Sequence, residues 1–456
     1  MEFSGRTAAE IKNWRPLLSW SVLVGAFGFS LSRARLLVVN HLALTNLLWA
    51  EDGLFPLCVR KVGFGACLID PFAGYLLFLP RAVAGGVSML PLEAWPLGAN
   101  LAAALIAGVA SGFVFGLMQS AGRSFTASSL LALLPVLAPI VGFEAIGAVG
   151  SSYMLLLYAT TLAISFPTNG KAWASATFIG LLTTTLTIPS AILLLLPLWV
   201  QYWRRRVTRA QALTLSGALI IGQAAQVLVA STAMNQRNIG FRLQDLQFWI
   251  QNMPNAVATY VPGVSFGSPT VFGQFELSGW FGQLVLPNLF ETGLVFVIAV
   301  TALGTWLVAR DHTRTSTGIG MLLLTGLALG AIPSLTGSLS NRYFVDSVLL
   351  WAAAGVIAID TYVVGGFRLG RARRLVLPVA AVLLVVLWLP AFGASPWRAT
   401  ASPPWPQALD ALLVTCATDQ GGQVSVVLSP EWPYEGLHMF EPTAPAISCA
   451  LLFIDE

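Results

Sequence analysis

Two adjacent carboxylates, Glu51 and Asp52, are the residues of this chain whose type and position best suit chemistry. They follow the first long apolar segment, and charged groups are costly in hydrocarbon, so acids at a membrane boundary usually have a function. A carboxylate there can act as a general base that takes the proton of a hydroxyl group, which then attacks an electrophilic carbon. The alternative is a pair of solvated acids in the headgroup layer. Trp49, which precedes the pair, suits the membrane interface or stacking on a sugar ring.

Arg81 and Arg342 are the basic residues best placed to bind a phosphate group. Arg81 interrupts the apolar stretch 71–92, and Arg342 stands just before a later apolar segment. A guanidinium group binds phosphate through two parallel charge-assisted hydrogen bonds, a geometry that lysine does not offer. For most of the other basic residues predicted on the outer face, the alternative is contact with lipid headgroups or snorkelling to the interface.

The four cysteines form two local pairs in the sequence, Cys58 with Cys67 and Cys416 with Cys449. Both pairs fall in segments predicted outside the cytoplasm, where disulfides form. The cysteine spacing matches no zinc site and the three histidines are scattered, so we expect no metal and no other cofactor. A divalent cation between paired carboxylates and a phosphate stays an open alternative.

The composition is that of a protein that crosses a membrane many times. Hydrophobic residues make up 56% of the 456 residues and charged residues only 10%, whereas soluble domains carry about 25% charged residues. The mean hydropathy is +0.76. We therefore expect an all-α polytopic membrane protein with about eleven transmembrane helices of roughly 20 residues. The predicted spans are 17–32, 97–119, 125–142, 153–167, 172–187, 190–202, 211–232, 286–309, 317–335, 345–365 and 375–393.

Basic residues predict how these spans are oriented. With the N-terminus in the cytoplasm, 15 of the 24 Lys and Arg residues fall on short cytoplasmic segments, as the positive-inside rule requires. They are Arg6, Lys12, Arg15, Arg123, Lys171, Arg204, Arg205, Arg206, Arg209, Arg310, Arg314, Arg368, Arg371, Arg373 and Arg374. This pattern accounts for the net charge of +4 without a nucleic-acid partner.

Segment 172–202 tests this orientation, because a single span there would put Lys171 and Arg204 on opposite sides of the membrane. Proline cannot continue the hydrogen-bond ladder of a helix, so we predict two short helices that meet at Pro189 and return the chain to the same side. Polar threonines before the break would then face a protein-lined cavity, since irregular backbone cannot face lipid. These are Thr183, Thr184, Thr185 and Thr187. The alternative is one kinked span.

The spans form one domain over 1–393, with outer loops at 33–96 and 233–285 and an outer tail at 394–456. In the first loop, prolines and Arg81 break the apolar stretch 71–92, which predicts one or two interfacial helices that lie on the membrane. The short outer turn 143–152 adds one acid, Glu144. In the tail, alternation over 423–428 predicts a strand within a small outer cap.

Short motifs in the first outer loop resemble those of a bacterial group within the GT-C superfamily of integral-membrane glycosyltransferases. That loop reads roughly Trp-Ala-Glu-Asp-Gly-x-x-Phe and then Pro-Tyr-Ala-Gly-Tyr-x-x-x-x-Pro-Arg in the group. This chain has Trp49-Ala-Glu-Asp-Gly-Leu-Phe55, then Pro71-Phe-Ala-Gly-Tyr75 and Pro80-Arg81. Glu144 and Arg342-Tyr343-Phe344 also look like the group's pattern, whereas Phe72 stands where the group has tyrosine.

The resemblance implies a GT-C-like enzyme that takes a sugar from a polyprenyl-phosphate donor and passes it, with inversion, to a glycan or lipid-linked acceptor. Asp52 or Glu51 would be the base, and Arg81 with Arg342 would hold the donor phosphate. The residues expected to line the substrate pocket are Tyr75, Glu144, Tyr343 and Trp49. The protein would lie in the bacterial inner membrane, with a cytoplasmic N-terminus and a periplasmic or extracellular C-terminus.

Two other classes of function stay open. A transporter or flippase of a lipid-linked or amphipathic solute would also use a helix broken at Pro189, because transporters bind solutes at discontinuous helices. Few charges lie inside the spans and no inverted repeat is visible, which argues against transport. The third class is a non-catalytic assembly subunit that recruits enzymes through its outer tail.

Overall fold

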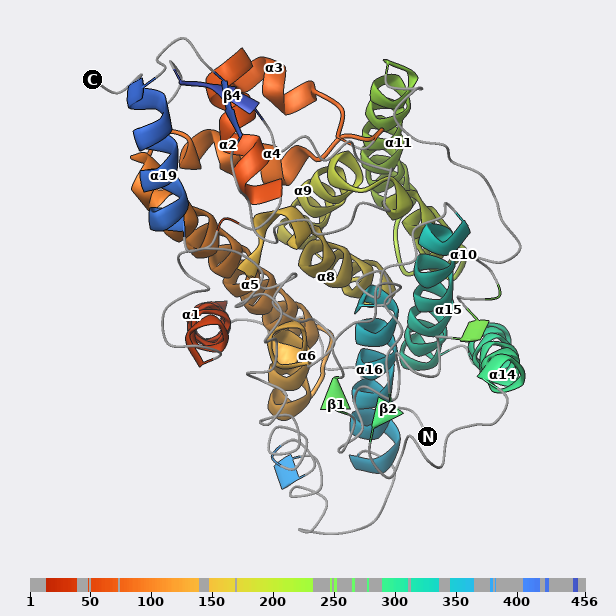
Figure 1. Ribbon diagram of the computed structural model, residues 1–456. Coiled ribbons are helices and arrows are strands. Elements are labelled where there is room, and N and C mark those ends of the chain that lie inside the picture. The colour runs from red at the N-terminus through yellow and green to blue at the C-terminus, as the bar shows by residue number, and fades with distance from the viewer. Residues whose placement is uncertain are drawn as a thin grey trace.

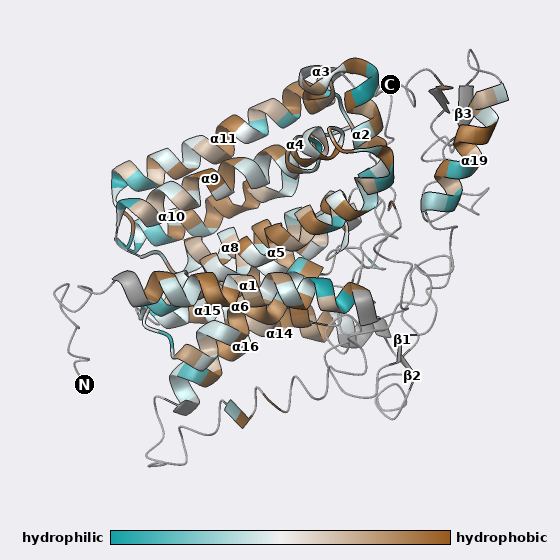
Figure 2. Cartoon of the chain, turned by 90° about the vertical axis from the view of Figure 1, so that its left-hand side faces the viewer, coloured by the Kyte–Doolittle hydropathy of each residue, from teal (hydrophilic) through white to brown (hydrophobic). Residues whose placement is uncertain are grey.

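The computed structural model describes residues 14–38, 48, 51–72, 74–138, 147–168, 170–232, 247, 250–251, 265–266, 277–278, 289–310, 313–335, 345–364, 378–379, 382, 405–418, 423–425 and 446–449. These residues fold mainly into helices that pack against one another (Figure 1). Most of the long helices are coloured as apolar over much of their length (Figure 2), in keeping with the composition.

Helices occupy ten of the eleven predicted spans, and the eleventh, 375–393, lies almost wholly outside the described residues. They are α1 (Trp14–Val38), α5 (Trp95–Ser120), α6 (Phe125–Leu137), α8 (Tyr153–Ser165), α9 (Lys171–Thr187), α10 (Leu195–Trp203), α11 (Arg209–Thr232), α14 (Leu289–Arg310), α15 (Arg314–Leu335) and α16 (Val345–Ala358). Segments containing α1, α5, α11 and α16 are long and apolar enough to cross a membrane. The fold is therefore that of a helical membrane protein.

Helices α1 and α5 approach closely because small residues face one another. A Cβ atom on Gly108 would lie 2.8 Å from the carbonyl oxygen of Gly25, and one on Gly112 would lie 2.7 Å from that of Ser21. Close backbone contact of this kind is a common mode of helix association in membranes. The Gly and Ala residues of α5 thus serve helix packing.

The chain reverses direction between α9 and α10, as the sequence predicts. Helix α9 ends at Thr187, and Pro189 begins the 3₁₀ helix η6 (Pro189–Leu194) that leads into α10. Gln201, near the end of α10, donates a hydrogen bond of 2.7 Å to the carbonyl oxygen of Ser165 at the end of α8. Because α9 begins shortly after α8, both ends of the broken segment lie on the same side of the bundle.

The threonines before the break differ from the prediction of a cavity-facing position. Thr184, Thr185 and Thr187 are fully buried, and each hydroxyl donates to the carbonyl oxygen one turn earlier in α9. Thr185 packs against Gly222 of α11, and the Thr187 hydroxyl also accepts a hydrogen bond from the amide of Leu79. These side chains therefore join packed helices instead of lining a cavity.

Arginines from the predicted cytoplasmic turns gather at one end of the bundle, which we call the basic end (Arg123, Arg204, Arg206 and Arg314). Arg123 donates a hydrogen bond of 2.6 Å to Thr315 in the first turn of α15. Arg204 donates to the carbonyl oxygen of Val308 near the end of α14. The opposite end, the loop end, carries the first outer loop.

Short helices build the first outer loop. They are α2 (Glu51–Val62), α3 (Phe64–Ile69), α4 (Phe78–Val87) and the 3₁₀ turn η3 (Leu92–Ala94). Helix α4 has 10 residues and is therefore about 15 Å long, half of the roughly 30 Å that a crossing needs. The stretch 71–92 thus contains one helix too short to cross a membrane, and its position on the membrane surface stays a prediction.

The C-terminal tail packs on this loop (Figure 1). Its elements are the helix α19 (Trp405–Thr418) and the strands β3 (Gln423–Ser425) and β4 (Ala446–Ser448), which pair in antiparallel fashion. Trp405 donates a hydrogen bond of 2.8 Å to the carbonyl oxygen of Leu92 and stacks on Trp95. Elsewhere, β1 (Ser265–Phe266) pairs with β2 (Leu277–Ser278) in the second outer loop.

Two disulfides brace the loop end, and both join the cysteines that the sequence pairs. Cys58–Cys67 links α2 to α3, and Cys416–Cys449 links α19 to the residue after β4. A covalent link between segments limits the freedom of the unfolded chain and thereby stabilises the folded one. The first outer loop and the tail are therefore each held together locally.

Candidate functional site

Asp52 lies at the start of α2 and is 5% exposed. Its two carboxylate oxygens accept separate backbone hydrogen bonds, one of 2.9 Å from the amide of Val149 and one of 2.8 Å from the amide of Gly150. Both donors belong to the 3₁₀ turn η5 (Val149–Ser151), which precedes α8. The N-terminus of a helix also favours a negative charge. Asp52 thus joins the first outer loop to the turn that precedes α8 and has a fixed orientation.

A small pocket adjoins the Asp52 carboxylate. It is lined by Asp52, Phe55, Pro56, Pro80, Val83, Ala84, Val87, Ala99 and Val149. The space open to the centre of a water molecule is about 10 Å³, which is roughly what one water needs. The pocket suits one hydroxyl-sized group within an apolar wall.

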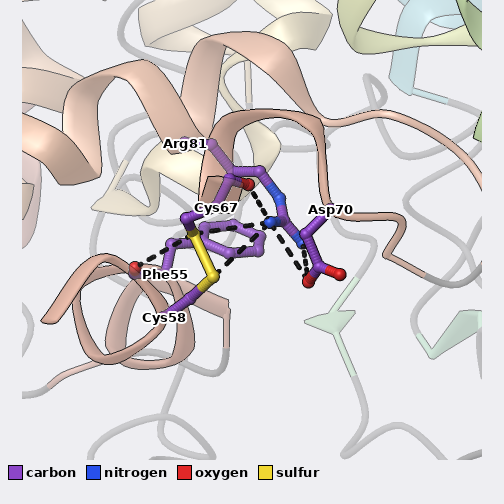
Figure 3. The surroundings of a disulfide bond; sticks show 5 residues. All are labelled: Phe55, Cys58, Cys67, Asp70 and Arg81. Atoms are coloured by element: carbon purple, nitrogen blue, oxygen red, sulfur yellow. Dashed lines mark hydrogen bonds and ion pairs between the residues drawn. A yellow bond between two sulfur atoms is a disulfide. The ribbon is translucent and has the colours of Figure 1, made fainter. Parts of the chain in front are cut away.

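Arg81 belongs to α4 and is 2% exposed. Its guanidinium group donates to the carbonyl oxygen of Cys67 and, at 3.3 Å, to the carboxylate of Asp70 (Figure 3). The same guanidinium lies 5.2 Å from the centre of the Phe55 ring. Burial lowers the pKa of Arg81, and the charge of Asp70 opposes that shift. The group stays charged because arginine does not lose its proton in proteins.

Phe55 connects the predicted site residues that the structure describes. It lines the Asp52 pocket, lies under Arg81, and belongs to a small apolar cluster against which Tyr75 packs. Backbone hydrogen bonds of 2.9 and 3.1 Å between Phe72 and Tyr75 shape this turn. Asp52, Arg81 and Tyr75 are therefore grouped around one aromatic ring.

The other predicted site residues are not described. Trp49, Glu144, Arg342 and Tyr343 lie outside the described residues, as does the side chain of Glu51. Their roles therefore stay predictions. Within the described part of the chain, no three His, Cys, Asp or Glu side chains lie close enough to hold a metal ion.

Gln226 of α11 is a buried polar residue that the sequence analysis did not single out. Its amide accepts a hydrogen bond of 2.8 Å from the amide of Leu76 and donates to the carbonyl oxygens of Leu76 and Thr185, both at 3.0 Å. Asp346, 7% exposed at the start of α16, is a second such residue. Both residues could have been identified from the sequence as polar residues inside apolar spans, since such residues rarely face lipid.

No protein-family model matches this chain, and no curated protein matches its sequence. The function is therefore inferred from Asp52, Arg81 and the arrangement of the helices around them.

Proposed function

We propose that this protein is a GT-C-like glycosyltransferase of the bacterial inner membrane that transfers a sugar from a polyprenyl-phosphate donor to an acceptor hydroxyl. The observation that carries the proposal is the buried Asp52 carboxylate, which two backbone amides hold at the edge of a hydroxyl-sized pocket. In this proposal the chain crosses the membrane about eleven times. The basic end lies in the cytoplasm, and the loop end faces the periplasm or the extracellular space.

The proposed reaction inverts the anomeric carbon. Asp52 takes the proton of the acceptor hydroxyl as its oxygen bonds to the anomeric carbon, on the face opposite the phosphate. The bond between that carbon and the phosphate oxygen breaks, and its electron pair leaves with the lipid phosphate. This leaving group is stable as an anion, so no general acid is required. Glu51 is the alternative base.

The pocket admits one hydroxyl-sized group, so a whole sugar ring does not fit beside Asp52 in this conformation. Helix α4 supplies several of its walls and also carries Arg81. Binding of the donor therefore requires α4 to move, and such closure or opening of loops is common in enzymes. Movement of α4 would bring its arginine into a new position relative to the donor phosphate.

Donor phosphate would bind Arg81, together with Arg342, by displacing Asp70. Because the Asp70 side chain is 56% exposed, its ion pair with Arg81 contributes at most about 1 kcal/mol. Asp70→Asn is therefore expected to tighten donor binding by up to about fivefold and to change the unfolding midpoint little. A titration of the purified protein with a polyprenyl-phosphate sugar measures the dissociation constant.

Glu93→Gln is the matched control, because Glu93 is an exposed acid of the same loop. It should leave donor affinity unchanged. Weaker donor binding by Asp70→Asn would show that Asp70 orients Arg81 and does not compete with the phosphate.

Transfer activity of the purified protein tests the proposed function itself. A panel of polyprenyl-phosphate sugars is offered with a candidate acceptor, and release of lipid phosphate is measured. We expect turnover with one class of donor. Absence of both turnover and binding across the panel would contradict the proposal.

Transport of a lipid-linked or amphipathic solute is the second candidate, because the helix broken at Pro189 is typical of transporters. Counterflow of a labelled solute in proteoliposomes, without consumption of a sugar donor, would support transport. The grouping of Asp52, Arg81 and Tyr75 around Phe55 favours the enzyme.

A further inference from the structure

The disulfide between Cys58 and Cys67 lies directly against the guanidinium group of Arg81 (Figure 3). The Nη1 atom of Arg81 is 3.4 Å from the Sγ atom of Cys67 and 3.7 Å from that of Cys58. The same nitrogen donates a hydrogen bond to the carbonyl oxygen of Cys67. One buried cation thus contacts both sulfur atoms, a contact that a link with a structural role alone does not need.

The charge of Arg81 favours the reduced form of this disulfide. A cation beside a cysteine stabilises the thiolate relative to the thiol. A disulfide opens by thiol–disulfide exchange, in which the leaving sulfur takes the electron pair of the broken bond and becomes a thiolate. Arg81 is 2% exposed, so salt and water screen its charge little. The disulfide should therefore be easier to reduce with Arg81 beside it than without it.

Asp70 is the acid that acts on Arg81 in the described part of the chain. Its carboxylate accepts hydrogen bonds of 3.4 and 3.3 Å from Nη1 and Nη2 of the guanidinium group. The Asp70 side chain is 56% exposed, so this ion pair is weak and the carboxylate can turn into solvent. A cysteine thiolate can therefore replace Asp70 as the anionic partner of Arg81.

The two sulfur atoms differ in how easily a reductant reaches them. Cys58 is partly exposed, whereas Cys67 is fully buried. An attacking thiolate therefore reaches Cys58, and Cys67 becomes the leaving group beside Arg81. The Sγ atom of Cys67 also lies 3.7 Å from the carbonyl oxygen of Phe55, which can accept a hydrogen bond from a thiol. The buried sulfur thus has a partner both as a thiolate and as a thiol.

The second disulfide, Cys416–Cys449, has different surroundings. Both of its cysteines are at most 2% exposed and belong to the apolar cluster that contains Trp405 and Leu412. In the described part of the chain its environment is that of a structural link. It therefore serves as an internal reference for Cys58–Cys67.

We propose that Cys58–Cys67 is a redox-active disulfide, which a dithiol reductant opens reversibly while Arg81 stabilises the thiolate that forms. One thiolate of the reductant attacks the Sγ atom of Cys58, the bond between the two cysteines breaks, and its electron pair stays on Cys67. The second thiolate of the reductant then attacks the reductant's own sulfur in the mixed disulfide, and that electron pair leaves with Cys58. Two electrons thus pass to the cysteines, and the reductant becomes a disulfide.

One consequence of reduction rests on the proposed function, whereas the redox chemistry itself does not. In the proposed reaction the donor phosphate displaces Asp70 from Arg81. In the reduced protein a thiolate next to Arg81 competes with that phosphate. Reduction also releases the link between α2 and α3, and α3 contacts α4 where the Phe64 ring covers Gly85. The reduced protein should therefore bind the donor less tightly than the oxidised protein.

A redox titration of the purified full chain in detergent tests the proposal. Buffers of reduced and oxidised dithiothreitol are used at about pH 9, where cysteine thiols are largely ionised. Alkylation and mass spectrometry of the peptides follow each disulfide separately. We expect Cys58–Cys67 to open while Cys416–Cys449 stays closed, and to close again when the oxidised reagent is restored. Opening of both together, or opening only when the protein unfolds, would overturn the proposal.

Arg81→Met is expected to make Cys58–Cys67 harder to reduce by at least about tenfold, because an opposite charge at this distance changes an ionisation equilibrium by that factor or more. The difference from wild type should shrink at about pH 6, where the thiols of the variant and of wild type are more fully protonated. Reduction of Cys416–Cys449 should not change. A role of Arg81 in packing alone would not produce this dependence on pH.

Lys61→Met is the matched control, since Lys61 is an exposed cation at the end of α2. It removes the same charge from the same loop and should change the reduction of Cys58–Cys67 by no more than about twofold. Equal changes in Arg81→Met and Lys61→Met, or no change in either, would overturn the role of Arg81.

Asp70→Asn gives an independent measurement if Arg81→Met does not fold, which the unfolding midpoint of each variant reports. It removes the acid that competes with the thiolate for Arg81, so Cys58–Cys67 should become easier to reduce by up to about fivefold. Glu93→Gln, an exposed acid of the same loop, should leave the equilibrium unchanged. Unchanged or more difficult reduction in a folded Asp70→Asn would contradict the proposal.

Titration of oxidised and reduced wild type with a polyprenyl-phosphate sugar separates this inference from the proposed function. We expect about tenfold weaker donor binding by the reduced form, since a thiolate then competes for Arg81. Equal binding by both forms would overturn the effect of reduction on the donor. Arg81-dependent reduction without donor binding by either form would support the redox-active disulfide and contradict the proposed function.

Discussion

Replacing Asp52 with asparagine is expected to lower sugar transfer by about 10²- to 10⁴-fold, the contribution that a positioned general base makes. The amide of asparagine is not basic, so it cannot take the proton of the acceptor hydroxyl. Initial rates with the donor that wild type uses measure the loss. Donor affinity should change little, because Asp52 does not contact the donor phosphate in the proposed reaction.

The same substitution has a structural effect that must be measured alongside activity. Both oxygens of Asp52 accept backbone hydrogen bonds, from Val149 and from Gly150. In Asp52→Asn one of these oxygens becomes an NH₂ group, which faces an N–H donor and leaves it unpaired. We expect a loss of about 1–3 kcal/mol in the free energy of unfolding.

Glu51→Gln distinguishes the roles of the two carboxylates, since it neutralises the acid next to Asp52 and leaves Asp52 unchanged. If Glu51→Gln loses turnover while Asp52→Asn retains it, the base is Glu51 and Asp52 has a structural role alone. Wild-type rates in both variants would end the proposal of a catalytic carboxylate in this loop.

Several features of this fold follow from local sequence signals. Apolar segment length located ten helices, and Pro189 located the reversal between α9 and α10, because proline has no amide hydrogen to extend the helix. The cysteine pairs were also local, at separations of 9 and 33 residues. Each of these inferences needed only residues near one another in the chain.

The contacts that shape the site could not be predicted in this way. Asp52 binds amides 97 and 98 residues later, and Gln226 binds Leu76 across 150 residues. Such pairs depend on how the helices pack, which no local pattern specifies. Arg81 illustrates the same limit, since its sequence context indicated a phosphate ligand and did not reveal its contacts with Asp70 and Cys67.

Gln226 explains how the helix break and the first outer loop are joined. In a continuous helix the carbonyl oxygen of Thr185 would accept from the amide of residue 189, but Pro189 has no amide hydrogen. The side chain of Gln226 donates to that carbonyl oxygen and also pairs with both backbone groups of Leu76. The buried side-chain amide of Gln226 thus pairs with the carbonyl oxygen that the helix break leaves free. It also fixes the backbone of the segment that leads into α4.

Gln226→Leu is therefore expected to destabilise the protein by about 3–9 kcal/mol, since it leaves three buried backbone groups unpaired at about 1–3 kcal/mol each. The cost is high in a membrane interior, where water cannot replace the lost partners. Because α4 lines the Asp52 pocket and carries Arg81, transfer activity should fall as well. Reversible unfolding in mixed micelles measures the loss of stability.

Gln223→Leu is the matched control, one turn earlier on the same helix. The side-chain oxygen of Gln223 is buried without a hydrogen-bond partner within the described residues, so its removal should cost little or stabilise the protein slightly. Equal stability of the two variants would show that the Gln226 side chain does not stabilise the helix break at Pro189. A large loss confined to Gln226→Leu, together with lower activity, would show that the Gln226 side chain supports both the helix break and the candidate site.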